Sequence, residues 1–169
     1  MILLNEDDVL ERLESQNDVA SFMNVAHDIL LSSIREFLPS LFVNNDEEIL
    51  EYAVKPLLAK SGPLDDIDIA LRLIYALGRM DKRLYADIIC FSQFCNFVRT
   101  GPDEIHFQDN IVYDLITNLN VITKNAPILN AVKNMKYADF SVYSEIRYSN
   151  MVKTALTLAV TSMLKELNL

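Results

Sequence analysis

The sequence predicts an all-α fold, a single bundle-like domain of about seven helices that spans residues 1–169 and ends in a long helix. Three observations support this prediction. Apolar residues recur at three- and four-residue steps over most of the chain, which is the spacing of one helix face. Capping residues stand where the predicted helices begin. The sequence lacks a convincing alternation of apolar and polar residues, which would indicate half-buried strands.

The first third of the chain contains three predicted helices. Asn5 is expected to cap a short helix that opens with three acidic residues, and Asp18 is expected to cap a longer one that Pro39 stops. The third helix begins around residue 45. It is expected to end near Pro56, because proline disfavours helical geometry in the residue before it.

Two further helices are expected on either side of Gly78, a residue suited to end the first of them because glycine takes the left-handed conformation cheaply. Asp65 or Asp66 caps the first helix, and Asp81 caps the second. The apolar side of the first helix, expected to face the core, consists of Ile69, Ala70, Leu73, Ile74 and Leu77. The run Thr100-Gly101-Pro102 is expected to close the second helix.

The remaining chain is predicted to form a helix over residues 109–119, a short helical piece that begins at Pro127 and one long helix from about Ser141. The long helix is apolar on more than one side. Such a helix lies at the centre of a fold or against another subunit. We expect a homodimer, because two-fold dimers are the commonest closed assemblies, although a central helix within one subunit would show the same pattern.

Charge and cysteine content narrow the class of protein. Residues 1–51 contain twelve acidic and two basic residues, a net charge of −10, whereas the whole chain carries −9. An acidic surface repels phosphate backbones, which argues against a nucleic-acid binder. Cys90 and Cys95 lie five positions apart and cannot bridge on one helix. The absence of a signal-peptide pattern and of a ~20-residue apolar stretch predicts a cytoplasmic protein without a membrane span.

Residues that carry chemistry are scattered. His27 falls near an apolar stripe and His106 in an expected loop, and neither has a partner at metal-ligand spacing. Asp65, Asp66 and Asp68 have the composition of a cation loop, but they stand at a helix start, where acidic residues are favoured without a metal. No nucleotide-binding or hydrolase motif occurs. We therefore expect no enzyme activity, no cofactor and no metal.

A set of short motifs connects the chain to a known family. The segments are YAVKPLL at residues 52–58, GPLD at 62–65, RLIYALG at 72–78 and YAD at 85–87. In type and spacing they resemble the signature of the MtlR/YggD family of mannitol operon repressors, and the resemblance runs from about residue 10 to the end of the chain. It implies a helical regulator that acts negatively on mannitol genes and has no recognised DNA-binding motif.

The turn between these motifs and the basic group after it form the candidate partner-binding surface. Its residues are Gly62, Pro63, Leu64, Asp65, Arg72, Arg79, Lys82 and Arg83. The same turn also has a purely structural interpretation, as the geometry of a helical hairpin. We expect a repressor that works through a protein partner, either a transcription factor or a phosphotransferase-system component. The alternatives are a direct DNA-binding repressor acting as a dimer, and a small enzyme or nuclease-like protein with an unrecognised site.

Overall fold

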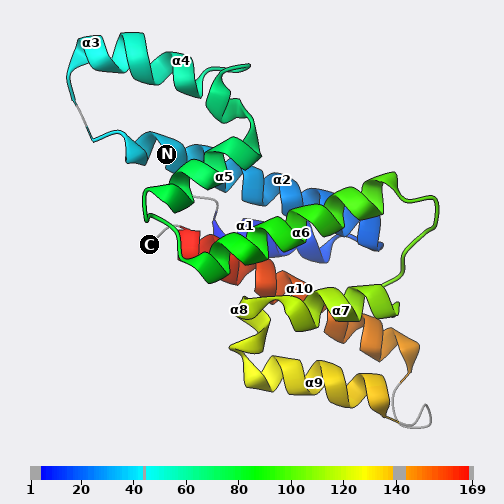
Figure 1. Cartoon of the computed structure of the whole chain (residues 1–169). Helices are drawn as coiled ribbons and strands as arrows, with labels where there is room; N and C mark the ends of the chain where they lie inside the picture. The colour runs from blue at the N-terminus through cyan, green and yellow to red at the C-terminus, as the bar shows by residue number, and fades with distance from the viewer. Residues whose placement is uncertain (1–4, 44, 139–143, 168–169) are drawn as a thin grey trace.

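The computed structural model describes residues 5–43, 45–138 and 144–167, and every regular element in these ranges is helical (Figure 1). The α-helices are α1 (Glu6–Glu14), α2 (Val19–Phe37), α3 (Glu47–Ile49), α4 (Lys55–Leu58), α5 (Ile67–Ala76), α6 (Lys82–Thr100), α7 (Asn110–Asn118), α8 (Asn120–Thr123), α9 (Ala126–Tyr137) and α10 (Glu145–Leu167). Two short 3-10 helices, η1 (Leu38–Leu41) and η3 (Pro63–Asp65), and one π-helix, η2 (Leu50–Val54), complete the order. Within the described ranges seven α-helices have nine residues or more, which confirms the predicted all-α fold.

Side-chain caps fix the helix starts as the sequence predicts. Asp18 accepts a hydrogen bond from the Ser21 amide at 2.7 Å, and Asp81 accepts one from the Arg83 amide at 2.5 Å. Of the two candidate caps for α5, Asp66 is the one used: its Oδ1 accepts from the Asp68 amide at 2.9 Å. These bonds satisfy amides that have no partner within the helix.

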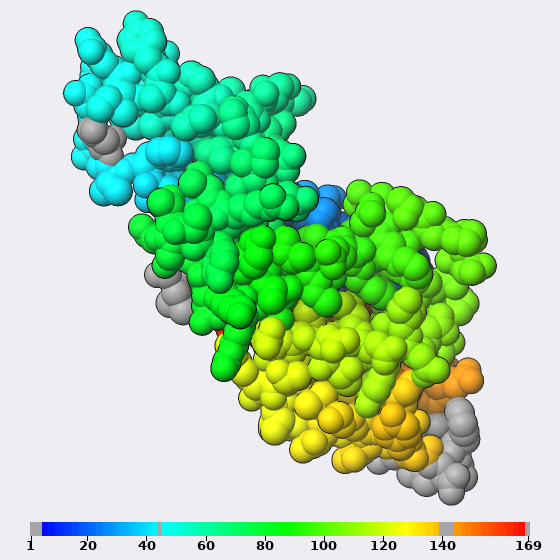
Figure 2. Space-filling view, viewed as in Figure 1, coloured from blue at the N-terminus to red at the C-terminus, as the bar shows by residue number. Residues whose placement is uncertain are grey.

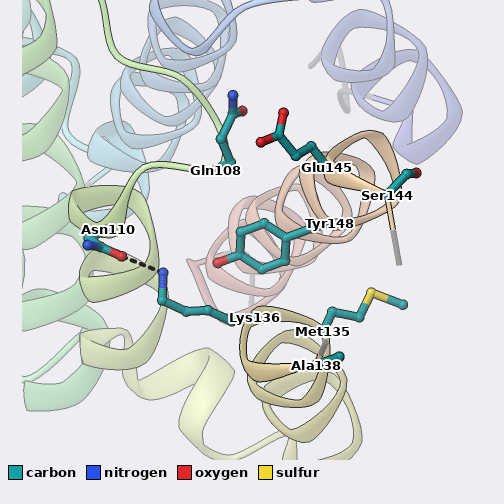
Figure 3. A pocket seen from close by; sticks show the side chains of 8 residues that line it. All are labelled: Gln108, Asn110, Met135, Lys136, Ala138, Ser144, Glu145 and Tyr148. Atoms are coloured by element: carbon teal, nitrogen blue, oxygen red, sulfur yellow. Dashed lines mark hydrogen bonds between the residues drawn. The ribbon is translucent and has the colours of Figure 1, made fainter. Parts of the chain in front are cut away.

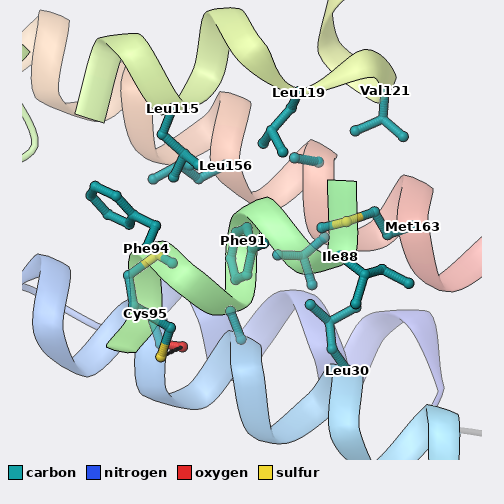
Figure 4. Close-up of a cluster of buried hydrophobic side chains, with 14 of the residues drawn as sticks. Leu30, Ile88, Phe91, Phe94, Cys95, Leu115, Leu119, Val121, Leu156 and Met163 are labelled. Atoms are coloured by element: carbon teal, nitrogen blue, oxygen red, sulfur yellow. Dashed lines mark hydrogen bonds between the residues drawn. The ribbon is translucent and has the colours of Figure 1, made fainter. Parts of the chain in front are cut away.

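The long helix α10 lies at the centre of the fold. It packs against α1, α2, α6, α7, α8 and α9. Its fully buried residues are Val152, Ala155, Leu156, Ala159, Val160 and Met163. Figure 4 shows α6 between α2 and α10, with Ile88 and Phe91 filling the space between them. Packing within one chain thus accounts for the apolar character of α10. The homodimer stays a prediction. Ser141, where this helix was expected to start, lies outside the described residues.

Pro56 does not end its helix, in contrast to the sequence prediction. It stands inside α4, which directly continues α3 and the π-helix η2. In η2 the Lys55 amide bonds to the Leu50 carbonyl, five residues back, so the register of hydrogen bonds changes just before the proline. The missing amide and the ring of Pro56 therefore fall at the first turn of a new helical register, where proline is tolerated.

The inward face of α5 is rotated relative to the prediction. Ala70, Leu71 and Ile74 are buried, whereas Ile69 is 47% exposed and Leu77 is 54% exposed. The prediction that Ile69 and Leu77 face the core was therefore wrong. Both residues lie at helix-compatible spacing with the true core residues, and only the tertiary position of α5 selects which side is covered.

A buried carboxylate joins α6 to α8. Asp87 of α6 is 1% exposed. Its Oδ1 accepts from the backbone amide and the side-chain amide of Asn120, both at 2.8 Å, and its Oδ2 accepts from the Val121 amide at 2.9 Å. Asp87 thus caps α8 across a large separation in sequence and fixes the fold-back of α7, α8 and α9.

Candidate binding sites

Two residues of the predicted partner-binding turn have structural roles. Leu64 is 5% exposed and belongs to the core. No side chain fits at Gly62, because a Cβ there would clash with the carbonyl oxygen of Pro56 and lie 2.9 Å from those of Leu57 and Ala59. These two residues support the structural interpretation of the turn. The rest of the predicted set is available to solvent.

The turn itself is held by Asp65. One carboxylate oxygen accepts from the Ser61 amide at 3.1 Å, and the other lies 3.7 Å from the guanidinium of Arg35. Ser61 has a φ of 68°, a conformation that non-glycine residues rarely adopt. Pro63 is exposed beside it. Asp65 therefore rigidifies the turn that presents Pro63.

The predicted basic group does not converge on one pocket. Arg72 lines a hollow on the α5–α6 face together with Tyr85. Arg79 lines a different hollow with Glu166 and places its guanidinium 5.9 Å from the centre of the Phe37 ring. Lys82 and Arg83 are exposed at the start of α6. The four basic side chains are therefore dispersed around the Gly78 turn, and they do not form one binding site for a phosphate.

Exposed apolar side chains adjoin this basic surface. Tyr75 of α5 stacks on Tyr85 of α6, with ring centres 4.7 Å apart and planes at 13°. The exposed Leu77 follows two residues after Tyr75. Residues 46–58 form an arm that projects from the body at one end of the molecule (Figures 1 and 2). The arm begins with acidic residues and includes Tyr52, which is 81% exposed. Aromatic side chains of this kind are enriched at protein interfaces.

A polar cavity between α7, α9 and α10 was missed by the sequence analysis. It has a volume of about 260 Å³ and is lined by Gln108, Asn110, Met135, Lys136, Ala138, Ser144, Glu145 and Tyr148 (Figure 3). These residues come from three separate helices and a loop. No local sequence motif predicts such a site, because its lining residues come together only when the chain folds.

Lys136 is the positive group of this cavity. Its ammonium donates to Asn110 Oδ1 at 2.5 Å and lies 4.6 Å from the centre of the Tyr113 ring and 5.7 Å from that of Tyr148. Tyr148 is 8% exposed, and its hydroxyl has no hydrogen-bond partner in the described structure. Burial, with smaller contributions from Tyr113 and Tyr137, raises the pKa of Tyr148 to about 12, so the hydroxyl keeps its proton.

No histidine or cysteine is among the residues that line the three hollows described above. His27 is half-buried, and burial followed by the nearby charge of Arg99 lowers its pKa. Cys90 and Cys95 are free thiols, which confirms that they form no disulfide with each other. Within the described ranges no group of three or more histidine, cysteine or acidic side chains is placed to hold a metal ion, and no helix is long and apolar enough to cross a bilayer.

Comparison with known proteins identifies the family. The model of the mannitol repressor family matches residues 5–168. The chain belongs to the mannitol repressor family. The Escherichia coli (strain K12) mannitol operon repressor is 28% identical over 166 residues, which cover 97% of this chain and 83% of that protein. The resemblance stated on the motifs at residues 52–87 is thereby confirmed.

Other family relatives are much more similar and carry a different name. A protein named Fumarase E from Escherichia coli (strain K12) is 65% identical over 167 residues, which cover 99% of both chains, and a Shigella flexneri protein of the same name is 64% identical. A fumarase is an enzyme. The expectation that the present chain is not an enzyme therefore stays a prediction, and the name of these relatives is the observation that stands against it.

Two solved structures share the fold. The crystal structure of a possible transcriptional regulator, YggD from Shigella flexneri, is 63% identical with a TM-score of 0.93, and the match covers 99% of each chain. The X-ray structure of the MtlR–HPr complex from Escherichia coli is 27% identical with a TM-score of 0.77, covering 97% of this chain and 98% of that one. The second structure shows a mannitol repressor relative in complex with another protein.

Proposed function

We propose that this chain is a negative regulator that acts by binding another protein, and that an HPr-type component of the phosphotransferase system is the partner. The observation that carries the proposal is the MtlR–HPr complex, formed by a relative that matches the chain almost from end to end. Of the two partner classes expected from the sequence, this observation favours the phosphotransferase component over a transcription factor.

The surface of the chain supports protein binding. The Gly78 turn combines the exposed charges of Arg72, Arg79, Lys82 and Arg83 with the exposed apolar Leu77 and the Tyr75–Tyr85 stack. Aromatic and arginine side chains contribute most of the energy at typical interfaces, and surrounding charges steer the partner. We assign the partner surface to this turn and to the neighbouring turn at residues 62–65, without its buried Leu64.

Co-elution of purified HPr with the chain on a size-exclusion column tests the partner. The double variant R72E/K82E reverses two exposed charges and tests the assigned partner surface. The control is K133E, which reverses an exposed charge on α9, away from that surface. We expect co-elution for the wild type and the control and its loss in the double variant. Lack of co-elution by the wild type contradicts the partner, whereas equal co-elution by all three contradicts only the assigned surface.

The second candidate function is that of a fumarase, which adds water to fumarate to give malate. The observation that favours it is the name of the 65% identical relative. The assay follows the loss of fumarate absorbance in the ultraviolet with the purified chain. Turnover that co-purifies with the chain and survives repeated purification supports an enzyme. A rate equal to that of a blank preparation from the same host rejects it.

A further inference from the structure

The cavity between α7, α9 and α10 has an excess of hydrogen-bond donors. A lysine ammonium has three donors, and Asn110 Oδ1 takes one from Lys136. The Tyr148 hydroxyl is a protonated donor without a partner. Gln108 accepts from the Ser149 hydroxyl through its Oε1 at 3.1 Å, which leaves its amide group to donate. Such a set of donors is complementary to a group rich in acceptors.

The position of Tyr148 points to the same ligand. Figure 3 shows its hydroxyl directed toward the ends of Lys136 and Asn110. A buried hydroxyl without a partner costs about 1–3 kcal/mol, and such unsatisfied groups in native proteins occur where a ligand completes them. An acceptor oxygen placed between the Lys136 ammonium and the Tyr148 hydroxyl accepts from both. A carboxylate supplies that oxygen together with the negative charge that Lys136 attracts.

Glu145 sets the other end of the ligand. Its carboxylate also lines the cavity, opposite Lys136 in Figure 3. It repels a second carboxylate brought close to it and accepts from a hydroxyl group. A volume of about 260 Å³ suits a molecule of a few carbon atoms.

We infer that this cavity binds a small hydroxycarboxylate with a single carboxylate, which Lys136 and Tyr148 hold while the hydroxyl faces Glu145. Asn110 is a positioning residue, because it fixes Lys136 by the bond between their side chains. The inference stands apart from the protein-binding proposal. It also stands apart from the fumarase candidate, because fumarate and malate each carry a second carboxylate, which Glu145 repels.

Isothermal titration with L-lactate, which has one carboxylate and one hydroxyl, tests the site in the full-length chain. We expect saturable binding by the wild type and binding weaker by about tenfold or more in K136M, because hydrogen bonds to charged groups contribute about 1.5–3 kcal/mol. Y148F keeps the ring and loses the hydroxyl, so it is expected to bind lactate less well while remaining at least as stable to urea as the wild type. K133M, on the same helix but outside the cavity lining, is the control.

Comparison ligands show which groups of the ligand the cavity recognises. Propionate lacks the hydroxyl and inorganic phosphate lacks the carbon chain, so both are expected to bind more weakly than lactate. L-malate adds a second carboxylate and is also expected to bind more weakly than lactate, and E145Q, which removes the repulsion at the far end, is expected to narrow that gap. No saturable binding of lactate by the wild type, or equal binding by wild type and K136M, overturns the assignment.

The fumarate assay keeps this inference distinct from the fumarase candidate. Lactate binding that depends on Lys136, without turnover of fumarate, supports the site and rejects the enzyme. Malate that binds to the wild type at least as tightly as lactate overturns the single-carboxylate assignment, whatever the outcome of the fumarate assay.

Discussion

The carboxylate of Asp87 accepts a hydrogen bond of 2.8 Å from the backbone amide of Asn120, although 33 positions separate the two residues in the chain. Through this bond the first half of α6 holds the start of α8. Because α8 leads directly into α9, the same contact places Lys136 beside Asn110 and so contributes to the shape of the polar cavity. A single buried acid therefore links the stability of the fold to the candidate site.

Removal of this carboxylate is expected to destabilise the protein strongly. In D87A the Asn120 and Val121 amides lose their acceptor inside the fold, and each buried unsatisfied donor costs about 1–3 kcal/mol. We predict a loss of about 3 kcal/mol in the free energy of unfolding. Urea denaturation followed by circular dichroism measures it. D114A, which truncates an exposed acid of α7, serves as control and should change the stability by less than about 0.5 kcal/mol.

The two turn glycines offer a matched pair of substitutions. In G62A the new methyl group meets the carbonyl oxygens of Leu57 and Ala59, whereas in G78A the space is open and only the φ of +68° is unfavourable. We predict a cost of about 3 kcal/mol for the first and about 1 kcal/mol for the second. Thermal unfolding of both variants gives the order, and a G78A protein less stable than G62A would contradict the packing described for the turn at residues 62–65.

The half-buried His27 predicts a loss of stability in mild acid. Burial and the nearby Arg99 lower its pKa in the folded chain below the ordinary value of 6.5. The unfolded chain therefore takes up a proton first as the pH falls, which favours unfolding. The contribution is complete above pH 6.5 and declines as the pH falls through the lowered pKa. H27Q should show a flatter dependence of the urea midpoint between neutral pH and pH 5; identical curves would show that His27 does not titrate in this way.

The predicted absence of specific DNA binding is testable with the isolated protein. Residues 1–51 carry a net charge of −10, and of the basic residues around Gly78, Arg72 and Arg79 line two separate hollows. A specific binder typically neutralises about 6–10 phosphates. We predict equal, weak retention of a mannitol operator fragment and of a scrambled control in a gel-shift titration at physiological salt. Tight retention of the operator alone would favour the direct repressor instead.

The sequence predicted the helices well because their signals are local. Caps such as Asp18 and Asp81, and the stop at Gly78, depend on residues within one or two turns. Periodicity also predicted a long last helix, but it left open whether this helix is central to the fold or packs against another subunit. Where the sequence failed, the deciding contact was distant or the backbone changed register: α5 turns Leu77 outward, and the π-helix before Pro56 lets the helix continue.

The candidate sites were likewise predictable only where their signals are local in the sequence. Family motifs located the turn at residues 62–65, but they could not tell the buried Leu64 from the exposed Pro63. The cavity escaped prediction because Gln108, Lys136 and Tyr148 come from parts of the chain that periodicity treats separately. A tyrosine within a helical apolar pattern predicts a core residue, and only the folded structure shows that its hydroxyl lacks a partner.

Binding to HPr tests the proposed function most directly, and isothermal titration of purified HPr into the chain measures it. The account predicts a saturable one-to-one isotherm with a dissociation constant of about micromolar or tighter, equivalent to roughly −8 kcal/mol or better. The R72E/K82E variant should bind at least about tenfold more weakly than the K133E control, as expected when interface charges are reversed. No heat beyond dilution at HPr concentrations far above micromolar, with a chain that is folded by circular dichroism, would contradict the claim that this protein acts through HPr.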